Sequence, residues 1–309
     1  TERLCEMSQI LKNLQAGPLL EQVLFAMVRN AIGEIRKQRT YHSVKAKMGY
    51  AGEMDDVCTS ADLAAQEAYT RAIRVLFPDY GIIAEEEGMR IACSRTFGEE
   101  QVYFTIDPLD GTKAFLRKQS SGIGTMVSLV RGDEVIATCI GDVMTQELYS
   151  QPPEDPGAWQ IDMANQRVPL VPETSHPLSK QFALIRGRPE DYSTLIRRML
   201  DLPANRGLCK SYQTVDGSIG LSMARMWNGE FGIAIQPETT MTPWDATPVI
   251  GMNRRLDILQ LQESENGYFL SVPYRLPTAN STQPETVYVH RKLLEEFMTW
   301  QYKTFELYK

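Results

Sequence analysis

The residue types most able to do chemistry are gathered in one short segment, Asp107-Pro-Leu-Asp-Gly-Thr112. Pro108 favours a tight turn, so the carboxylates of Asp107 and Asp110 are expected on the same side of the chain. Gly111 allows the backbone to approach a ligand closely, and Thr112 adds a hydroxyl and an N–H group at the start of the next segment. Carboxylates of this kind suit Mg²⁺, which prefers a few carboxylate oxygens together with the phosphate of its substrate. In isolation the segment would more simply be an Asp-Pro turn that caps a helix, so a metal site requires further acids elsewhere in the chain.

Two further acids are candidates for the same site. Glu85 opens an acidic run that follows a short apolar strand predicted at 81–84, although acidic runs are usually solvated loops. Because Asp107 also stands at the end of a predicted strand, Glu85 and Asp107 would face the same ion if the two strands are neighbours. Asp245 lies near the start of a helix predicted from residue 246, where a carboxylate is favoured for capping alone.

A second segment, Asp56-Val-Cys-Thr-Ser-Ala-Asp62, leads into a helix that is predicted to end at Phe77-Pro78. Thr59 and Asp62 have the spacing of a capping box, which satisfies N–H groups at a helix start. That structural role leaves Asp56 unexplained, so Asp56 is a further candidate for chemistry. The polar stretch 42–56 before this helix is predicted to be a mobile loop.

Strands and helices that alternate along the chain must position these residues. Val102, Phe104 and Ile106 form one face of a strand, and 123–150 predicts a meander of strands, hence an antiparallel sheet. Helices are predicted at 19–38, 216–227 and, as the last element, 284–300. The Pro- and Gly-rich stretch 151–157 predicts the boundary between an N-terminal lobe, residues 1–152, and a C-terminal lobe, residues 153–309.

Bulk properties narrow the class of protein. The 309 residues can build a large core, and 43% hydrophobic with 23% charged residues is ordinary for a globular protein. A formal net charge of −7 without a basic run argues against nucleic-acid binding. No apolar run approaches membrane-spanning length, and the five scattered cysteines indicate neither a disulfide framework nor a zinc site. A cytoplasmic location without a membrane partner is the default expectation.

The ordered set of motifs resembles the inositol monophosphatase superfamily of lithium-sensitive, Mg²⁺-dependent phosphatases. The family pattern appears here, in the expected order, as Asp56…Thr59…Asp62, Glu85-Glu86, Asp107–Thr112 and Trp244-Asp245. The resemblance covers approximately residues 20–250. It implies an α/β fold of mixed sheets, a layered α-β-α-β-α sandwich, with metal ions at the junction of the two lobes.

The resemblance also implies a role for each motif residue. Glu85, Asp107 and the carbonyl of Leu109 would bind one Mg²⁺, and Asp107, Asp110 and Asp245 a second, with two or three ions per site. Thr112 would hydrogen-bond Asp56, and this pair, with Glu85 at the metal, would orient and deprotonate the attacking water. The residues implied to contact the phosphorylated substrate are Asp110, Gly111, Thr112, Ser218 and Glu238.

Several features leave the substrate open. Lys113-Ala-Phe-Leu-Arg117 looks more like branches that act on 3′-phosphoadenosine 5′-phosphate or on histidinol phosphate, and Met252-Asn-Arg-Arg255 replaces the usual glycine-rich turn. A small inositol monophosphate-like ester is the default substrate, and those two phosphates are the alternatives. A regulatory protein that keeps this scaffold and works through a protein partner is the non-enzyme alternative. The family often forms dimers, so a homodimer is expected.

Overall fold

The computed structural model describes residues 18–47, 49, 56–94, 100–201 and 206–306. Within these residues the largest sheet has eight strands. β3 and β5 are parallel, and the other neighbouring pairs are antiparallel. In spatial order the strands are β10 (Arg167–Pro169), β9 (Trp159–Ile161), β8 (Leu148–Gln151), β7 (Glu134–Asp142), β6 (Gly124–Arg131), β5 (Val102–Asp110), β3 (Gly81–Ala84) and β4 (Arg90–Ile91).

A second, six-stranded sheet is formed mainly by the C-terminal part of the chain. In spatial order its strands are β12 (Ser211–Val215), β11 (Phe182–Arg186), β13 (Ile233–Gln236), β18 (Thr286–His290), β15 (Ile258–Glu263) and β16 (Phe269–Val272). β11 is parallel to β12 and β13, and the remaining pairs are antiparallel. Two small ribbons pair β1 (Val44–Lys47) with β2 (Asp56–Thr59), and β14 (Thr239–Met241) with β17 (Ser281–Gln283).

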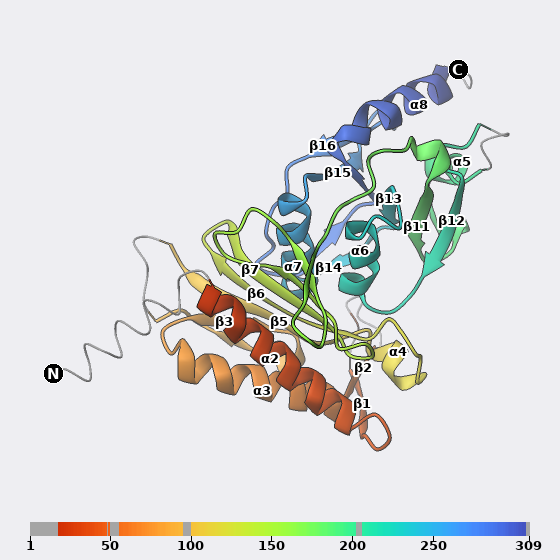
Figure 1. Ribbon diagram of the computed structural model, residues 1–309. Helices are drawn as coiled ribbons and strands as arrows, with labels where there is room; N and C mark the ends of the chain where they lie inside the picture. The colour runs from red at the N-terminus through yellow and green to blue at the C-terminus, as the bar shows by residue number, and fades with distance from the viewer. Residues whose placement is uncertain (1–17, 48, 50–55, 95–99, 202–205, 307–309) are drawn as a thin grey trace.

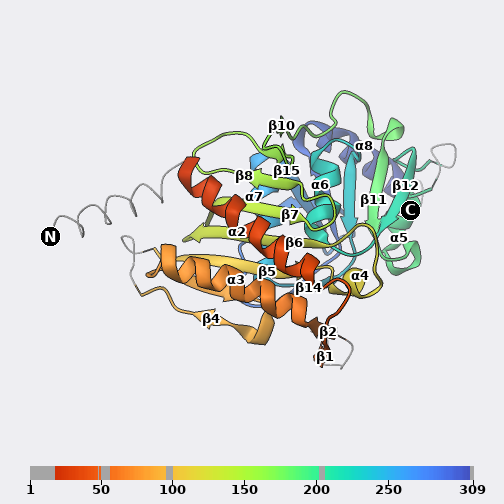
Figure 2. The same cartoon turned by 60° about the horizontal axis from the view of Figure 1, so that its bottom comes forward.

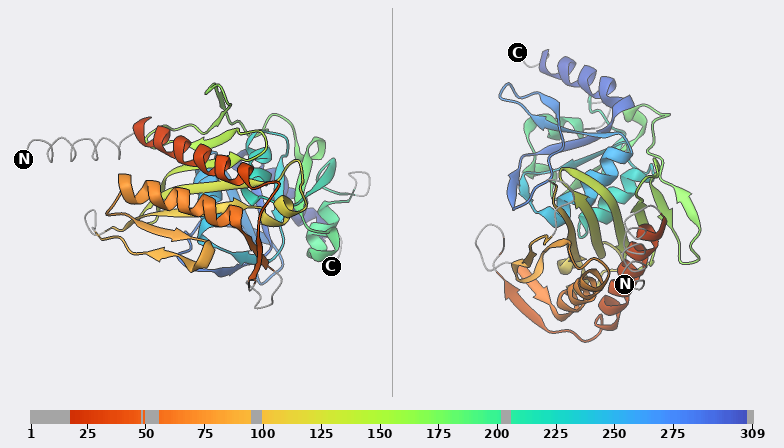
Figure 3. Two further views of the ribbon diagram at one scale, coloured as in Figure 1. Left: turned by 90° about the horizontal axis from the view of Figure 1, so that it is seen from below. Right: turned by 90° about the vertical axis from the view of Figure 1, so that its left-hand side faces the viewer.

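Helices cover both sheets and give five layers (Figures 1 and 3). Figure 2 shows α2 (Pro18–Lys37) and α3 (Ser60–Leu76) lying across one face of the larger sheet. α6 (Ile219–Trp227) and α7 (Pro243–Arg255) lie between the sheets, and α5 (Thr194–Met199) and α8 (Leu294–Glu306) pack on the outer face of the smaller sheet. This arrangement confirms the predicted layered α-β-α-β-α sandwich. No helix in the described part of the chain has the length and apolar character needed to cross a bilayer.

The middle layer fixes the two sheets relative to each other. Trp227 of α6 and Met252 of α7 are fully buried in one cluster with Ile140 of β7 and Tyr288 of β18. Burial of side chains this large stabilises the fold by roughly 2–3 kcal/mol each. The indole N–H of Trp227 also donates to the side-chain oxygen of Asn253 at 2.8 Å, which joins the two helices. Residues carried by the larger sheet and by α7 are therefore held in a defined geometry.

Most elements that carry the candidate residues agree with the predictions. α2 occupies the predicted helix 19–38, and α3 begins with the predicted capping box of Thr59 and Asp62. β3 and β5 are neighbours, with Ala84 paired to Ile106, as the proximity of Glu85 and Asp107 requires. β5 to β8 form the predicted antiparallel meander.

Three predictions about elements need correction. The predicted helix 284–300 contains β18 in its first part, because its β-branched residues are buried in the sheet between β13 and β15, and α8 begins only at Leu294. The predicted loop 42–56 contains β1, although residues 48 and 50–55 lie outside the described part. The expected lobe boundary at 152/153 falls within the larger sheet, since β9 and β10 continue that sheet to Pro169.

Candidate functional site

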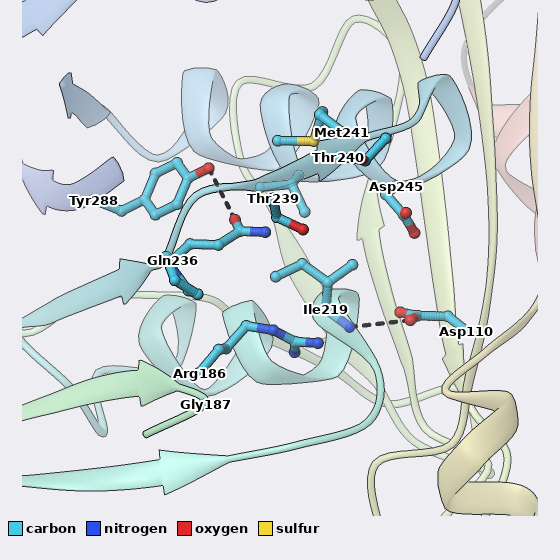
Figure 4. A pocket seen from close by; sticks show the side chains of 12 residues that line it. Asp110, Arg186, Gly187, Ile219, Gln236, Thr239, Thr240, Met241, Asp245 and Tyr288 are labelled. Carbon is cyan, nitrogen blue, oxygen red and sulfur yellow. Dashed lines mark hydrogen bonds between the residues drawn. The ribbon is translucent and has the colours of Figure 1, made fainter. Parts of the chain in front are cut away.

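Three carboxylates from two elements meet at the junction of the layers. Asp107 and Asp110 lie at the end of β5, and Asp245 lies in the first turn of α7. Each offers an oxygen atom within 4.8 Å of the others, which is a suitable spacing for a metal ion. Asp110 and Asp245 face a cavity of about 210 Å³ (Figure 4). The structure therefore brings together three acids that are as many as 138 positions apart in the chain.

The negative charges of these acids repel one another where little water can screen them. Burial, together with the charges of Glu85, Asp110 and Asp245, holds the pKa of Asp107 well above its usual range. Burial and the charge of Asp110 raise the pKa of Asp245 to about 6. Like charges that are removed from water disfavour ionisation, and a bound cation reverses this effect. The oxygen ligands and the excess negative charge fit a hard divalent cation.

Glu85 lies beside these acids but is paired with a lysine. The Nζ atom of Lys47 in β1 is 2.8 Å from Oε1 of Glu85 and 2.8 Å from Oε1 of Glu86. Burial raises the pKa of Glu85 to about 8, although Lys47 opposes the shift, and the two carboxylates hold the pKa of Lys47 above its usual range. Glu85 thus contributes charge to the site, while Lys47 neutralises part of it. Lys47 was not predicted, because a single lysine in a polar stretch carries no motif.

Asp110 connects the larger sheet to α6. It accepts hydrogen bonds from the Ser218 hydroxyl, from the Ile219 N–H at 3.1 Å and from the Gly220 N–H at 3.0 Å. These N–H groups belong to the first turn of α6, which has no internal acceptors for them and carries a positive partial charge. The Ser218 hydroxyl also caps α6 by accepting from the Leu221 N–H at 3.0 Å. Ser218, predicted to contact substrate, here positions Asp110.

Arg186 at the end of β11 holds the loop that begins α6. Its guanidinium donates to the carbonyl oxygen of Gly217 at 2.8 Å and to the Ser222 hydroxyl at 2.9 Å. Its charge partly offsets the rise that burial causes in the pKa values of Asp110 and Asp245. Sequence reasoning missed Arg186, and the available signal was its place at the carboxyl end of a parallel strand, where α/β sheets usually bind ligands.

The predicted hydrogen bond between Asp56 and Thr112 is replaced by one between Asp62 and Thr112. The Thr112 hydroxyl oxygen is 3.1 Å from Oδ1 of Asp62 and 3.1 Å from the Leu109 carbonyl oxygen. The other oxygen of Asp62 accepts from the Thr59 N–H and hydroxyl at 2.7 and 2.6 Å. The capping box therefore uses one oxygen of Asp62 and leaves the other for Thr112.

Asp56 lies at the opposite end of β2 from the capping box. Thr59 is three positions further along the strand, a span of about 10 Å in an extended chain. Its carboxylate accepts from the Val57 N–H at 2.9 Å and lies 3.7 Å from Nζ of Lys47. Asp56 is thus the third carboxylate near Lys47, after Glu85 and Glu86.

The turn after Asp110 can be made only with glycine. Gly111 has a φ of +96°, and a Cβ atom there would lie 2.3 Å from the Gly122 carbonyl oxygen. The short helix α4 (Thr112–Leu116) follows directly, so the first N–H groups of α4 lie next to the acids. Glu238, by contrast, is exposed and is not among the residues that line the cavity.

Gln236 and the Arg186 guanidinium lie across the cavity from the acids, whereas Thr240 lies beside Asp245 (Figure 4). Thr239 also lines the cavity, and the Tyr288 hydroxyl donates to the side-chain oxygen of Gln236 at 3.5 Å. An anion with attached hydroxyl groups would find acids for a metal ion on one side and hydrogen-bonding groups on the other. The arrangement suits chemistry on a small polar ester.

Known proteins match this chain in both sequence and structure. The model of the inositol monophosphatase family matches residues 19–250. The 3′(2′),5′-bisphosphate nucleotidase CysQ of Salmonella typhimurium is 30% identical over 162 residues, which are 50% of this chain and 62% of that protein. The chain spans less than two thirds of the length of the curated relatives it matches, from 34% to 62%.

Two solved structures share the fold over most of their length. The extragenic suppressor protein suhB from Bartonella henselae has a TM-score of 0.66 at 15% identity, covering 91% of this chain and 98% of that chain. An IMPase/NADP phosphatase complexed with NADP and Ca²⁺ has a TM-score of 0.66 at 16% identity, covering 91% and 94%. At such low identity these similarities show the fold alone.

Proposed function

The chain belongs to the inositol monophosphatase family, whose model matches residues 19–250, and on that premise we propose that it is a Mg²⁺-dependent phosphomonoesterase of a small phosphate ester. The observation that carries the proposal is the meeting of three carboxylates, the buried Asp107 and Asp110 and the half-buried Asp245, beside a hydrogen-bonded pair of Asp62 and Thr112. A protein that only bound a protein partner would have no need of clustered acids next to a potential base.

The acids would hold the metal. Asp107, Asp110 and Asp245 supply carboxylate oxygens, with Glu85 beside them and the Leu109 carbonyl at the turn. Bound Mg²⁺ would neutralise these carboxylates, lower the pKa of water and stabilise the charge that develops on the phosphoryl oxygens. The Ca²⁺ in the related IMPase/NADP phosphatase structure supports a divalent cation in this family.

Asp62 and Thr112 would move the proton. When the Thr112 hydroxyl donates to Asp62, its lone pairs are free to accept a hydrogen bond from water. The water proton then passes to the threonine oxygen, while the threonine proton passes to Asp62. Burial raises the pKa of Asp62 to about 6, which suits a general base near neutral pH. This pair orients the water for in-line attack on phosphorus.

The size of the cavity favours a small leaving group. Its volume of about 210 Å³ is below the roughly 300–1,000 Å³ of typical ligand pockets. A single polyol ring with its phosphate suits it better than a nucleoside bisphosphate, and Gln236, Thr239 and Thr240 offer hydrogen bonds to ring hydroxyls. We therefore place inositol monophosphate-like esters before nucleotide and histidinol phosphates.

Release of inorganic phosphate tests the proposal. The purified protein is assayed with inositol monophosphate, glucose 6-phosphate, histidinol phosphate and 3′-phosphoadenosine 5′-phosphate, with MgCl₂ or with EDTA. We expect Mg²⁺-dependent release that Glu85→Gln and Asp245→Asn reduce at least about 100-fold. Glu87→Gln is the matched control, because Glu87 is in the same acidic run but is exposed. Equal release with and without Mg²⁺, or no release from any ester, would contradict the proposal.

A further inference from the structure

The β14–β17 ribbon places a second cavity next to the first. Met241 pairs with Ser281, and Thr240 pairs with Thr282. β14 lines the cavity that holds Asp110 and Asp245, whereas β17 lines a separate cavity of about 420 Å³. This larger volume falls within the roughly 300–1,000 Å³ typical of small-molecule sites.

The lining of the second cavity is mixed and nearly uncharged, with apolar side chains from α7 and β16 beside neutral polar ones. Its polar side chains come from β15 and β17 and include Gln260, Gln262, Gln283 and Thr282. Arg275 is the one charged residue that lines it in the described part of the chain. The described lining therefore lacks the carboxylates that a metal ion would require, and Arg275 alone could pair with an anion.

The three glutamines use their amide N–H groups in hydrogen bonds within the protein. Gln260 donates its amide group to the Pro273 carbonyl oxygen at 3.1 Å, and Gln262 donates to the Thr286 hydroxyl at 3.3 Å. Gln283 donates to Thr286 at 3.0 Å, and its Oε1 has no hydrogen-bond partner among the described residues although the side chain is only 6% exposed. Because the Gln283 oxygen is buried, a ligand would meet it only if this side chain turned toward the cavity. Gln260 and Gln262 are half-buried and line the cavity, so their amide groups lie within reach of a ligand.

Three residues are common to the linings of the two cavities. Met241, Val249 and Tyr288 line both of them. The Tyr288 hydroxyl accepts from Gln283 at 2.9 Å and donates to Gln236 at 3.5 Å, so one hydrogen-bonded chain runs from one wall to the other. Figure 4 shows Met241 on the strand above Asp245, at the edge of the first cavity. Methionine is flexible and can move aside to admit a ligand that spans both spaces.

We infer that the second cavity is a subsite for an uncharged, hydroxyl-rich ring, a sugar or polyol unit attached to the group that bears the phosphate. Ring hydroxyls would donate to the amide oxygens of Gln260 and Gln262, and Arg275 would donate to a ring or hydroxyl oxygen. Arg275 would repel an amine, and a nucleobase offers fewer donors than a sugar. The inference rests on the proposed function for the phosphate end of the substrate, and it names the class of that substrate.

Two probes test the subsite. Glucose 6-phosphate and trehalose 6-phosphate differ by one additional, uncharged glucose ring. Their dissociation constants are measured by calorimetry in the presence of Mg²⁺. The proteins are the Asp62→Asn variant, in which turnover is expected to be slow, and the double variant that also carries Gln262→Leu. Gln213→Leu is the matched control, because Gln213 lines neither cavity. We expect trehalose 6-phosphate to bind about five- to tenfold more tightly than glucose 6-phosphate, which is equivalent to one or two hydrogen bonds. Gln262→Leu should make the two dissociation constants equal.

The outcomes separate the subsite from the proposed reaction. Equal dissociation constants for the two esters, a ratio that survives Gln262→Leu, or no binding of either ester at millimolar concentration would overturn the subsite. Loss of the ratio in Gln213→Leu as well would also overturn it. If the wild-type protein releases no phosphate from any ester while the expected ratio is observed, the proposed reaction fails and the subsite stands.

Discussion

The hydroxyl oxygen of Thr112 lies 3.1 Å from a carboxylate oxygen of Asp62, although the two residues are 50 positions apart in the chain. Asp62 is fixed by the capping box at the start of α3, and Thr112 is fixed by the turn that follows β5. Two local features that each stabilise a helix start thus also set the distance between a hydroxyl and its acceptor. Asp56, which the family pattern led us to favour, is instead near Lys47.

This geometry predicts different results for two aspartates of one motif. We expect Asp62→Asn to lower kcat for phosphate release at least about 100-fold, because the amide cannot accept the proton from Thr112. Asp56→Asn should change kcat by less than about threefold, since Asp56 does not contact Thr112. Steady-state assays with Mg²⁺ and the best ester compare the two, and circular dichroism verifies that both variants are folded. A larger loss in Asp56→Asn would show that the hydrogen bond to Asp62 has no part in the reaction.

The raised pKa values predict how stability depends on pH. Burial raises the pKa of Asp62 and of Asp245 to about 6, and that of Glu85 to about 8. These groups bind protons more tightly in the folded state than in the unfolded chain, where their pKa is about 4. Their stabilising contribution is therefore complete below about pH 4 and is lost as the pH rises through 6 to 8. We expect the melting temperature in EDTA to fall as the pH rises from 5 to 8.

Saturating Mg²⁺ should remove much of that fall, because a cation favours the ionised carboxylates. The measurement is differential scanning fluorimetry at pH 5, 6, 7 and 8, with EDTA or with MgCl₂. Asp245→Asn is the matched variant, since it removes one of the three clustered acids and should flatten the pH dependence. Identical pH profiles with and without Mg²⁺ would argue against a metal site at these carboxylates.

The sequence motifs identified the clustered acids of the site, but not the other residues that contact or position these acids. Asp107, Asp110 and Asp245 meet as expected because β5 ends beside the N-terminus of α7, and the apolar alternation of β5 marks that end. The sequence indicates only a capping role for Asp62, because the capping box accounts for both Thr59 and Asp62. Nothing in the sequence shows that one oxygen of the Asp62 carboxylate remains available to Thr112. Residue type could not identify Lys47 or Arg186, whose roles depend on the pairing of β1 with β2 and on the end of β11.

The element that was predicted least well is β18. Residues 284–300 begin with Pro284 and end in a true helix, so the whole stretch resembled one helix. Val287 and Val289 are β-branched and fully buried between β13 and β15, and such residues favour strands. Tertiary burial decided the outcome, and the sequence alone does not show which neighbours a short strand will have.

Lys47 should affect both the stability of the metal-free protein and the Mg²⁺ concentration needed for activity. We expect Lys47→Gln to destabilise the metal-free protein by roughly 3 kcal/mol, because it leaves Glu85 and Glu86 without their partner at 2.8 Å. The same change should lower the Mg²⁺ concentration for half-maximal activity, since the cation would meet more negative charge. Lys45→Gln is the control, because Lys45 is exposed on the same strand. Urea unfolding in EDTA and Mg²⁺ titration of activity measure the two effects, and similar values for both variants would contradict this role.

Substitution by alanine should have opposite effects on stability at Gly111 and at Gly33. Gly111→Ala should destabilise the protein by more than about 3 kcal/mol, because φ is +96° and the new Cβ would lie 2.3 Å from the Gly122 carbonyl oxygen. Gly33→Ala should stabilise it by about 0.5–1 kcal/mol, since Gly33 is inside α2 and nothing lies within 4 Å of its Cβ position. Urea unfolding measures both free energies in the presence of Mg²⁺. Because Gly111 also sets the turn between Asp110 and Thr112, any Gly111→Ala protein that folds should still lose phosphate release, whereas Gly33→Ala should retain it. Equal stability of the two variants would mean that the turn after Asp110 can relax, and the fixed distance between Thr112 and the acids would then have no structural basis.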